Sequence, residues 1–508
     1  MDENFVEPII INTDNLIAPS VANSLWENRI NSYFIYNSQD VPKCTIAIQG
    51  YNRLDKTKYC VECVLDYTQD VDYELILVDN GSDDGTYEYF QSVPFKRKKI
   101  IRVTKNIGST FPSKNFRELA LGKYIVIISN DVYVTKNWLS NLLRCYESDP
   151  TIGLVLPLSS NVSNNQQLDF DYQNFEEMQT KAAAFNQSDP TKWEERMRLI
   201  SLITITPRSV LDLVGNFDPA FIHDFGEDDY AVRLRRAGFK LMLCKDTWIC
   251  HDHDFRNLED KDPEEYKKGL ESGRNTYREK YHGIDAWDDI NNYDMHLLSI
   301  LDTIQLATER ISALSVDPRC GTPVLEIRNH LKRRGVKKTD SYAFTTQAKY
   351  YTDLLTVAND VKSDRIDFIQ NHYNNDTFNI VYLGEPVNTY PSPITLLQKL
   401  YQLLKSGGVL FFKLRNVNDI NNFMISAGIG GSTDPDMPAN LPLNELNECL
   451  RIFGATDISI SAEQEFLSEQ DKATINGWLT AIKGKKSVSQ DDFVHLTTKN
   501  YLYCISKG

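Results

Sequence analysis

Three acidic residues stand where the chain could bind and transform an anionic substrate. Asp79 and Asp131 each follow a short apolar run, residues 73–78 and 124–128, of the kind that forms a buried central strand. Ligands of an open α/β sheet bind beyond the carboxyl ends of its strands, where a carboxylate can hold a divalent cation and the cation a diphosphate. Asp228 lies in an acidic run that opens a later helical stretch, where a carboxylate could act as a general base. We expect the three acids to share one cavity, although each alone could simply close a turn or cap a helix.

The elements that must position these acids alternate between strands and helices. Strands are predicted at residues 44–48, 73–78, 99–104 and 124–128, and helices at 55–66 and 113–121. This alternation predicts a mostly parallel, doubly wound sheet of the α/β class. Polar residues end each apolar run, so they should meet at one edge of the sheet.

Composition excludes several classes of partner. The 508 residues contain 55 basic and 70 acidic side chains, a net charge of −15, which argues against a broad nucleic-acid or anionic-membrane surface. The nine cysteines show no disulfide framework, and Cys60 and Cys63 fit one helix better than half of a zinc site. We see no signal peptide and no stretch approaching the roughly 20 apolar residues of a membrane span. We therefore expect a soluble, cytoplasmic protein of two or three domains.

A series of motifs resembles the family 2 nucleotide-sugar glycosyltransferases, which have the GT-A fold. The resemblance begins near residue 42 and implies a glycosyltransferase domain over residues 41–285, after a lead-in of residues 1–40. Each motif alone is common, but their order and spacing are specific. The matching pieces are Gln49-Gly-Tyr-Asn52, Val78-Asp-Asn-Gly-Ser-Asp-Asp-Gly-Thr86, Asn106-Ile-Gly108, Asn115, Ile128-Ser-Asn-Asp-Val-Tyr-Val134 with Trp138, Gly215-Asn-Phe-Asp218, Gly226-Glu-Asp-Asp-Tyr-Ala-Val-Arg-Leu-Arg-Arg-Ala-Gly238 and His251.

The resemblance implies a pocket for the nucleotide and its sugar. Asp79 should hydrogen-bond the base, since a carboxylate accepts from the imide N–H of uracil or thymine. Asn106, Lys114 and Asn115 fall where the family lines this pocket, although they could also hydrogen-bond locally in a loop and a helix start. The residues expected in the pocket are Gln49, Tyr51, Asn52, Asp79, Asn106, Lys114, Asn115, Asn130 and Asp131.

The resemblance also implies a metal site. Ser129-Asn130-Asp131 occupies the position of the family's D-x-D motif, with only the last acid present. Asp131 should therefore bind Mn²⁺ or Mg²⁺, with His251 completing the site as in some family members. His253 would share the face of His251 in a strand and is the alternative ligand. Imidazole ligands favour Mn²⁺, because Mg²⁺ prefers oxygen.

Glu227 and Asp228 are the candidate catalytic acids. In the family the acid after the glutamate is the general base, so Asp228 should take the proton of the acceptor hydroxyl and Glu227 should orient the acceptor. A single displacement assisted by one base inverts the anomeric centre, which predicts an inverting transferase. Acids at a helix start also suit the helix dipole, so capping is the structural alternative.

The second half of the chain begins with a predicted linker over residues 286–316. Residues 287–314 are predicted to form one helix, in which Leu297, Ile304 and Ile311 recur every seven residues. Such a helix would brace the two domains or form a homodimer contact along this seam.

Residues 317–508 resemble a class I methyltransferase, a Rossmann-like α/β domain. The predicted succession is strand 322–327, strand 378–384, helix 394–404 and strand 405–412. After the first strand the family has a glycine-rich loop, whereas this chain has Arg328-Asn329-His330. Side chains there would obstruct S-adenosylmethionine. We therefore expect a non-catalytic domain used for packing, acceptor docking or oligomerisation.

Together these features predict a metal-dependent, inverting glycosyltransferase that uses a UDP- or dTDP-sugar, with UDP-N-acetylglucosamine as the first candidate. The expected acceptor is a hydroxyl of a bacterial surface glycan, or a Ser or Thr of a surface protein such as flagellin. One alternative is an enzyme that both glycosylates and methylates, against which the missing glycine loop argues. Another is a carbohydrate-binding protein built on two decayed enzyme folds, against which the intact set of Asp79, Asp131, Asp228 and His251 argues.

Overall fold

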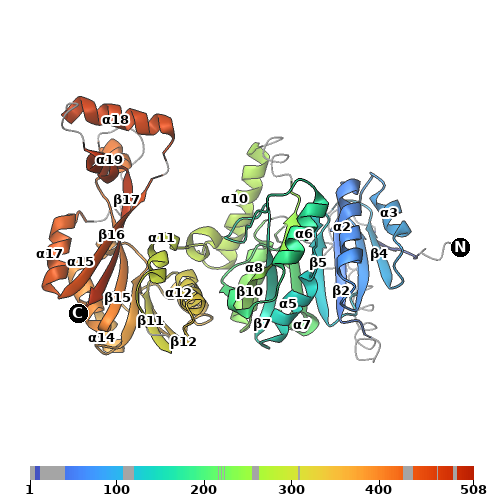
Figure 1. The fold of residues 1–508 in the computed structure, drawn as a ribbon, viewed down its shortest axis with the longest axis horizontal. Coiled ribbons are helices and arrows are strands. Elements are labelled where there is room, and N and C mark those ends of the chain that lie inside the picture. Colours follow the sequence, from blue (N-terminus) through green and yellow to red (C-terminus); the bar gives the residue numbers. More distant parts are fainter. Residues whose placement is uncertain are drawn as a thin grey trace. The chain divides into compact units, whose positions relative to one another are not determined.

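The computed structural model of the protein describes residues 6–11, 41–106, 119–215, 217–218, 220–221, 224–253, 263–306, 309–426, 439–465, 467–483 and 489–508. Its contacts divide the chain into two compact units, Met1–Asn291 and Asn292–Gly508. Each unit is built around its own β-sheet (Figure 1). The division falls within the predicted linker, residues 286–316.

The described residues of the first unit form a ten-stranded sheet with the order β1-β4-β3-β2-β5-β9-β7-β10-β6, and β8 pairs with β10 outside this path. The strands are β1 (Ile9–Ile11), β2 (Cys44–Gly50), β3 (Tyr73–Asp79), β4 (Lys98–Val103), β5 (Tyr124–Ser129), β6 (Val132–Tyr133), β7 (Ile152–Ser159), β8 (Trp193–Arg196), β9 (Ile203–Pro207) and β10 (Lys240–His251). Strands β1 to β5 run parallel to one another, and β9 runs antiparallel between β5 and β7. The four predicted strands are therefore confirmed as β2, β3, β4 and β5.

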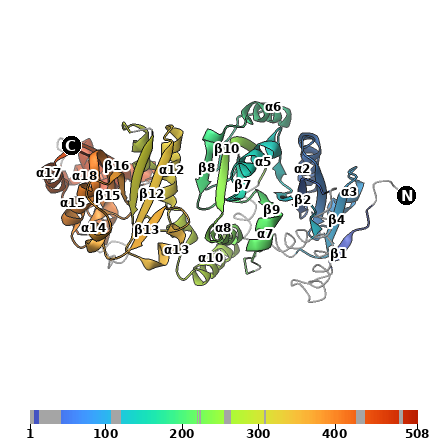
Figure 2. The ribbon, with the colours of Figure 1, turned by 90° about the horizontal axis from the view of Figure 1, so that it is seen from below.

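Successive residues of a strand point to opposite sides of the sheet, and in this sheet residues on both sides pack against helices. Ile46 and Ile48 of β2 pack in one core with α2 (Leu54–Tyr67) and α5 (Trp138–Glu147), whereas Ala47 packs in another with Leu211 of α7 (Arg208–Val214). Helices α2 and α7 lie on opposite sides of the strands (Figure 2). The other helices in the described part of this unit are α3 (Thr86–Ser92), α6 (Phe175–Phe185), η1 (Pro190–Lys192), α8 (Gly226–Arg236), α10 (Pro263–Lys280) and η2 (Ala286–Ile290).

The predicted helices and the lead-in have different outcomes. Helix 55–66 is confirmed by α2, whereas helix 113–121 lies almost wholly outside the described residues. Within the lead-in, Ile9–Ile11 forms β1 and pairs in parallel with β4 at the edge of the sheet. This short part of the lead-in thus belongs to the first unit.

The described residues of the second unit form a seven-stranded sheet with the order β13-β12-β11-β14-β15-β17-β16. The strands are β11 (Arg310–Val316), β12 (Lys338–Thr345), β13 (Asp360–Ser363), β14 (Phe378–Leu383), β15 (Leu404–Arg415), β16 (Ala455–Gln464) and β17 (Thr498–Lys507). Strands β11 to β15 are parallel, and β17 is antiparallel to both β15 and β16. The order reverses between β11 and β14, as in other doubly wound sheets. The helices include α12 (Thr322–Arg333), α13 (Tyr351–Leu354), α14 (Ile369–His372), α15 (Pro393–Leu403), α16 (Ile420–Ser426), α17 (Leu443–Ile452), α18 (Glu469–Lys483) and α19 (Gln490–Thr497).

The predicted single helix over residues 287–314 is wrong. The chain there forms η2, α11 (Met295–Leu298), η3 (Ser299–Asp302) and then strand β11. Leu297, Leu301 and Ile311 are fully buried in one core of the second unit. The seven-residue recurrence of Leu297, Ile304 and Ile311 therefore reflects burial of residues in separate parts of the chain, and the buried Leu297 and Ile311 leave no exposed seam for a homodimer contact along it.

The predicted strand at residues 322–327 is also wrong, because these residues begin helix α12. Pro323 sits in the first turn, where its missing N–H costs no hydrogen bond. Gly321 precedes the helix with a φ of 115°, which favours glycine. The first strand of the unit is β11, so the loop to compare with the methyltransferase glycine loop is 317–321 and not Arg328-Asn329-His330.

Candidate functional site

The carboxyl ends of β2, β3 and β5 meet at one edge of the first sheet, as the sequence predicts. They open onto a cavity of about 560 Å³, a size that suits a small-molecule ligand. Predicted site residues that line this cavity are Gln49, Tyr51, Asn106, Asn130, Asp131, Glu227 and His251, together with His253. Asn52, Asp79 and Asp228 do not line it, and Lys114 and Asn115 lie outside the described residues.

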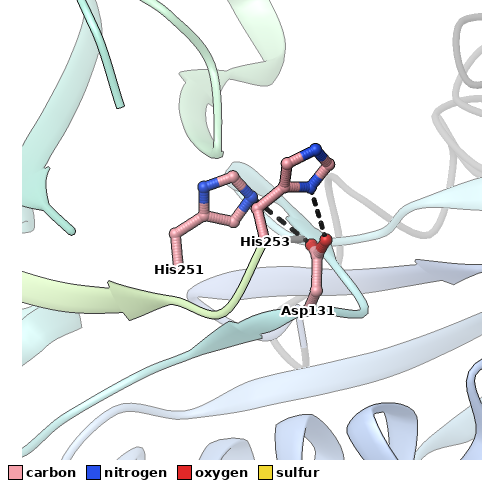
Figure 3. A group of neighbouring side chains, drawn as sticks. All are labelled: Asp131, His251 and His253. Atoms are coloured by element: carbon pink, nitrogen blue, oxygen red, sulfur yellow. Dashed lines mark hydrogen bonds and ion pairs between the residues drawn. The ribbon is translucent and has the colours of Figure 1, made fainter. Parts of the chain in front are cut away.

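Asp131 and His251 meet because two short strands pair. The end of β10 runs antiparallel to β6, with His251 opposite Val132, and the Asp252 N–H donates to the Asp131 carbonyl at 2.8 Å. Nε2 of His251 lies 3.7 Å from Oδ1 of Asp131. Nδ1 of His253 lies 3.1 Å from Oδ2 (Figure 3). Both histidines therefore face one carboxylate, from positions about 120 residues further along the chain.

A neighbouring loop determines which ring nitrogen of His251 carries the proton. Its Nδ1 lies 3.0 Å from the carbonyl oxygen of Asn161, which can only accept, so Nδ1 carries the proton and Nε2 presents a lone pair. Burial lowers the pKa of His251, and the attraction of Asp131 offsets only part of this effect. Burial opposes ionisation of Asp131, but the hydrogen bond from His253, the charge of His251 when it is protonated at low pH and the charge of Arg53 bring the pKa of Asp131 below the usual value. The pair is thus a neutral imidazole beside a carboxylate.

Asp131, His251 and His253 fit a divalent cation. One ligand atom from each lies within 4.8 Å of the others. A carboxylate with two imidazoles is a donor set that suits Mn²⁺ and its neighbours in the first transition row better than Mg²⁺. Sequence reasoning left His251 and His253 as alternatives, whereas the structure places both against Asp131.

Arg53 is a cavity residue that sequence reasoning missed. Its Nη1 lies 3.2 Å from Oδ2 of Asp131. The sequence feature that could have identified Arg53 is its position directly after the motif residue Asn52, in the loop that follows β2.

Asn130 and Asn52 brace the loops around the site. The Asn130 amide donates to the Asn52 carbonyl at 3.0 Å and to the Thr57 hydroxyl at 2.8 Å. Asn52 in turn links the loop after β2 to the loop after β3, because its N–H donates to Ser82 Oγ and its Oδ1 accepts from the Asp83 N–H. Asn52 therefore holds the cavity wall and does not face the cavity.

Asp79 is buried beneath the cavity wall, with no exposed surface. Its Oδ1 accepts from the Ser82 N–H at 3.0 Å. Its Oδ2 lies 3.7 Å from Arg102 Nε and accepts no hydrogen bond from any described residue. Burial raises the pKa of Asp79, and the bonds from Ser82 and the charge of Arg102 offset this only in part. The neighbours Asn80 and Asn106, joined at 3.1 Å, line the cavity beside it.

The three consecutive acids of α8 point to different partners. Asp228 is 2% exposed and accepts hydrogen bonds from the Arg198 guanidinium. Asp229 accepts from the Tyr281 hydroxyl at 2.6 Å and pairs with Lys280. Glu227 alone lines the cavity, and burial together with the Asp228 charge raises its pKa to about 7. The geometry thus favours Glu227 over Asp228 as the acid that meets a ligand.

In the second unit, the loops at the carboxyl ends of β11, β12 and β14 contact one another. Asp317, directly after β11, accepts from the Thr346 N–H directly after β12 at 2.6 Å and from the hydroxyl of Tyr390, seven residues beyond β14, at 2.7 Å. An added Cβ at Gly384 would lie 2.2 Å from the Asp317 carbonyl oxygen, so the two loops already touch. Arg319 pairs with Glu385 at 2.8 Å. These residues do not fit S-adenosylmethionine, which needs open space and close backbone approach at this switch point.

No helix in the part of the chain that the structure describes has the length and apolar character needed to cross a membrane.

Comparison with known proteins gives a family match within the first unit. Residues 45–194 match the family model described as glycosyl transferase family 2. The chain is 27% identical over 121 residues to a poly(ribitol-phosphate) beta-glucosyltransferase of Bacillus spizizenii, covering 22% of this chain and 19% of that protein. It is 23% identical over 215 residues to glycosyltransferase AglE of Haloferax volcanii, covering 42% of this chain and 67% of that protein. The match thus spans about a fifth of the first relative.

Two kinds of solved structure resemble part of the chain. Mannosyltransferase PcManGT from Pyrobaculum calidifontis, in complex with GDP-Man and Mn²⁺, aligns with a TM-score of 0.36 at 15% identity, over 54% of this chain and 78% of that one. A SAM dependent methyltransferase from Archaeoglobus fulgidus aligns with a TM-score of 0.30 at 17% identity, over 46% of this chain and 98% of that one.

The predicted α/β fold class is confirmed by the two mostly parallel sheets, and the predicted family 2 resemblance of the first domain is confirmed by the family match. Residues 45–194 thus carry the match to glycosyl transferase family 2, and the carboxyl strand ends within them line the cavity described above.

Proposed function

We propose that the first unit transfers a sugar from a UDP- or dTDP-sugar to an acceptor hydroxyl, with a divalent cation held by Asp131, His251 and His253. The observation that carries this proposal is the meeting of these three residues and Glu227 around one cavity of about 560 Å³. When bound, the cation would neutralise the diphosphate of the donor. The two imidazoles favour Mn²⁺ over Mg²⁺.

The free oxygen of Asp79 supports a pyrimidine nucleotide. Ser82 already donates to Oδ1, so Oδ2 alone could accept a hydrogen bond from a base, and because Asp79 is fully buried the base would reach it only if the cavity wall moves. Uracil and thymine offer one imide N–H, whereas guanine offers two adjacent donors on the same edge. UDP-N-acetylglucosamine is the first donor to test.

We assign the general base to Glu227. Its carboxylate would take the proton of the acceptor hydroxyl while the acceptor oxygen bonds to the anomeric carbon and the bond from that carbon to the diphosphate breaks. A pKa near 7 suits this role. The earlier choice, Asp228, is held by Arg198 and would position the helix start. One displacement inverts the anomeric centre, and an NMR spectrum of the product tests this directly, since a retained configuration refutes it.

We propose that the second unit does not methylate and that the acceptor is a glycan hydroxyl or a Ser or Thr side chain, reached in the cytoplasm. The contacts of Asp317 with the neighbouring loops support the first part of this proposal. Product mass spectrometry with glycan and peptide acceptors separates the two acceptor classes.

The donor assay tests the proposal without knowledge of the acceptor. UDP release from a panel of UDP-sugars is measured with Mn²⁺, with Mn²⁺ and EDTA, and with the variants Asp131→Ala and Glu227→Gln. We expect slow hydrolysis of one donor, lost with EDTA and with Asp131→Ala. Equal UDP release from the wild type and Asp131→Ala would refute the proposed site.

A further inference from the structure

Arg53 is a positively charged side chain of the cavity to which the proposed function gives no role. Among the described residues that line the cavity, it is the one lysine or arginine, beside the acids Asp131, Asp224 and Glu227. A departing nucleoside diphosphate carries several negative charges, and positive groups aimed at it stabilise the departure. Arg53 is therefore the candidate side chain for this task.

Arg53 forms an ion pair with the Asp131 carboxylate, which is also a proposed ligand of the cation. Its Nη1 lies 3.2 Å from Oδ2 of Asp131, the oxygen that His253 also contacts at 3.1 Å. The other oxygen, Oδ1, faces His251 at 3.7 Å. A cation bound between Asp131 and His253 would therefore compete with Arg53 for the same oxygen.

The side chain of Arg53 can move while its backbone stays fixed. The Arg53 carbonyl accepts from the Thr57 N–H at 2.9 Å in the first turn of α2. The side chain is 37% exposed, against 8% for that of Asp131. Its long stem and the adjoining cavity let the guanidinium exchange one anionic partner for another without a change in the fold.

We propose that Arg53 is an exchanging cation, which neutralises Asp131 while the metal is absent and pairs with the diphosphate once metal and nucleotide are bound. This inference rests on the proposed function and adds a residue to it. Asp131 faces a positive charge in both states, first Arg53 and then the cation. The guanidinium gains a phosphate partner that its planar fork matches well.

The exchange predicts effects of opposite sign when the charge of Arg53 is removed. The nucleotide-free protein should bind Mn²⁺ more tightly, because Asp131 is released from a competitor. UDP should bind more weakly, because its diphosphate loses a partner. An arginine that only stabilised the loop would weaken both kinds of binding.

Titration calorimetry on the full chain tests the exchange. It gives the Kd of Mn²⁺ without nucleotide, and the Kd of UDP and of uridine with saturating Mn²⁺, for the wild type, Arg53→Gln and Arg53→Lys. For Arg53→Gln we expect about 3-fold tighter Mn²⁺ binding, roughly 10-fold weaker UDP binding and unchanged uridine binding. Arg53→Lys should recover part of the UDP affinity. Arg97→Gln, which removes an arginine paired with Asp72 away from the cavity, is the control and should change nothing.

Three results overturn the exchange: weaker Mn²⁺ binding in Arg53→Gln, unchanged UDP binding, or equal losses for UDP and uridine. A different result would refute the proposed function. If the wild type binds neither Mn²⁺ nor UDP, both proposals fall, whereas normal wild-type binding with an unaltered Arg53→Gln refutes the exchange alone.

Discussion

Glu227, Asp228 and Asp229 show how one helix turn gives three identical charges three different environments. Successive helix residues point about 100° apart, so one acid enters the cavity, one meets Arg198 and one meets α10. The motif predicts where the three acids lie along the chain, but it does not predict which way each side chain points. Sequence alone therefore located the acidic cluster and chose Asp228, whereas the geometry favours Glu227.

Glu227→Gln should lower the transfer rate by about 10²–10⁴-fold, because the acceptor hydroxyl loses its proton acceptor. In the wild type, kcat/KM should rise with pH through about 7, where Glu227 becomes charged. The pH profile of a coupled UDP-release assay checks both. A flat profile in the wild type, or full activity in the variant, would assign the base elsewhere, and Asp228→Asn is the matched comparison.

The same substitution should stabilise the protein at high pH. The folded-state pKa of Glu227 lies above its usual value of about 4.5, so its contribution to stability is full below pH 4.5 and is lost as pH rises through about 7. Glu227→Gln should therefore have a free energy of unfolding higher by roughly 1–3 kcal/mol at pH 8 and unchanged near pH 4.5. Urea titrations at the two pH values measure this, and an equal effect at both contradicts the raised pKa.

His253 should matter to the cation site as much as His251. We expect His253→Ala and His251→Ala each to weaken Mn²⁺ binding at least about 10-fold, since each removes one ligand of three. His296→Ala, at the start of α11 in the second unit, serves as the control. Calorimetry that finds a loss only in His251→Ala would remove His253 from the site.

At the scale of elements, the pairing of β6 with the end of β10 builds the cation site. The strand ends at β2, β3 and β5 follow from apolar runs and parallel-sheet geometry, so they were predictable. The β6–β10 pair joins segments about 120 residues apart, and two-residue β6 carries no periodicity to reveal it. Only the motif resemblance placed His251 near Asp131.

Two predictions for the second half of the chain were wrong because they used the pattern of apolar residues and ignored the signals of turns and helix starts. Leu297 and Ile311 are fourteen residues apart, two steps of a seven-residue repeat, but lie in a short helix and a strand of one core. Residues 322–327 are apolar enough for a strand, yet Gly321 and Pro323 mark a helix start. Local capping signals would have corrected the second prediction, whereas the first depends on tertiary packing.

Gly81 tests how closely the loop after β3 must approach its neighbour. Its φ is 84°, and an added Cβ would lie 2.7 Å from backbone atoms of Lys105 and Asn106. Gly81→Ala should lower the free energy of unfolding by about 2–4 kcal/mol and weaken UDP binding, because Asn106 lines the cavity. Gly238→Ala, with a φ of 90° and no atom within 4 Å, should cost only about 1 kcal/mol. Equal losses in urea titrations would show that the close contact does not matter.

At the scale of the whole molecule, two units with separate cores divide the chemistry. The first holds the cavity and the family 2 match, and the second has a doubly wound sheet with loops in contact at its switch point. Fold class was predictable for both, since it depends on alternating strands and helices. The contact between these loops was not, because it depends on hydrogen bonds between them.

S-adenosylmethionine should therefore not bind. Calorimetry on the full chain should show no heat at cofactor concentrations up to about 1 mM, and the melting temperature should not change. UDP with Mn²⁺ provides the positive control on the same sample. Binding at micromolar affinity would mean that the Asp317–Tyr390 contact opens and would restore the bifunctional alternative.

Pulsed electron paramagnetic resonance of Mn²⁺ on the protein with UDP tests the central claim most directly, because it reports the nuclei beside the metal. The account predicts coupling to imidazole nitrogen and to UDP phosphorus in one complex, with the nitrogen signal reduced in His251→Ala and in His253→Ala and the complex lost in Asp131→Ala. Phosphorus coupling without nitrogen, or a spectrum equal to that of Mn²⁺ and UDP in buffer, would contradict it.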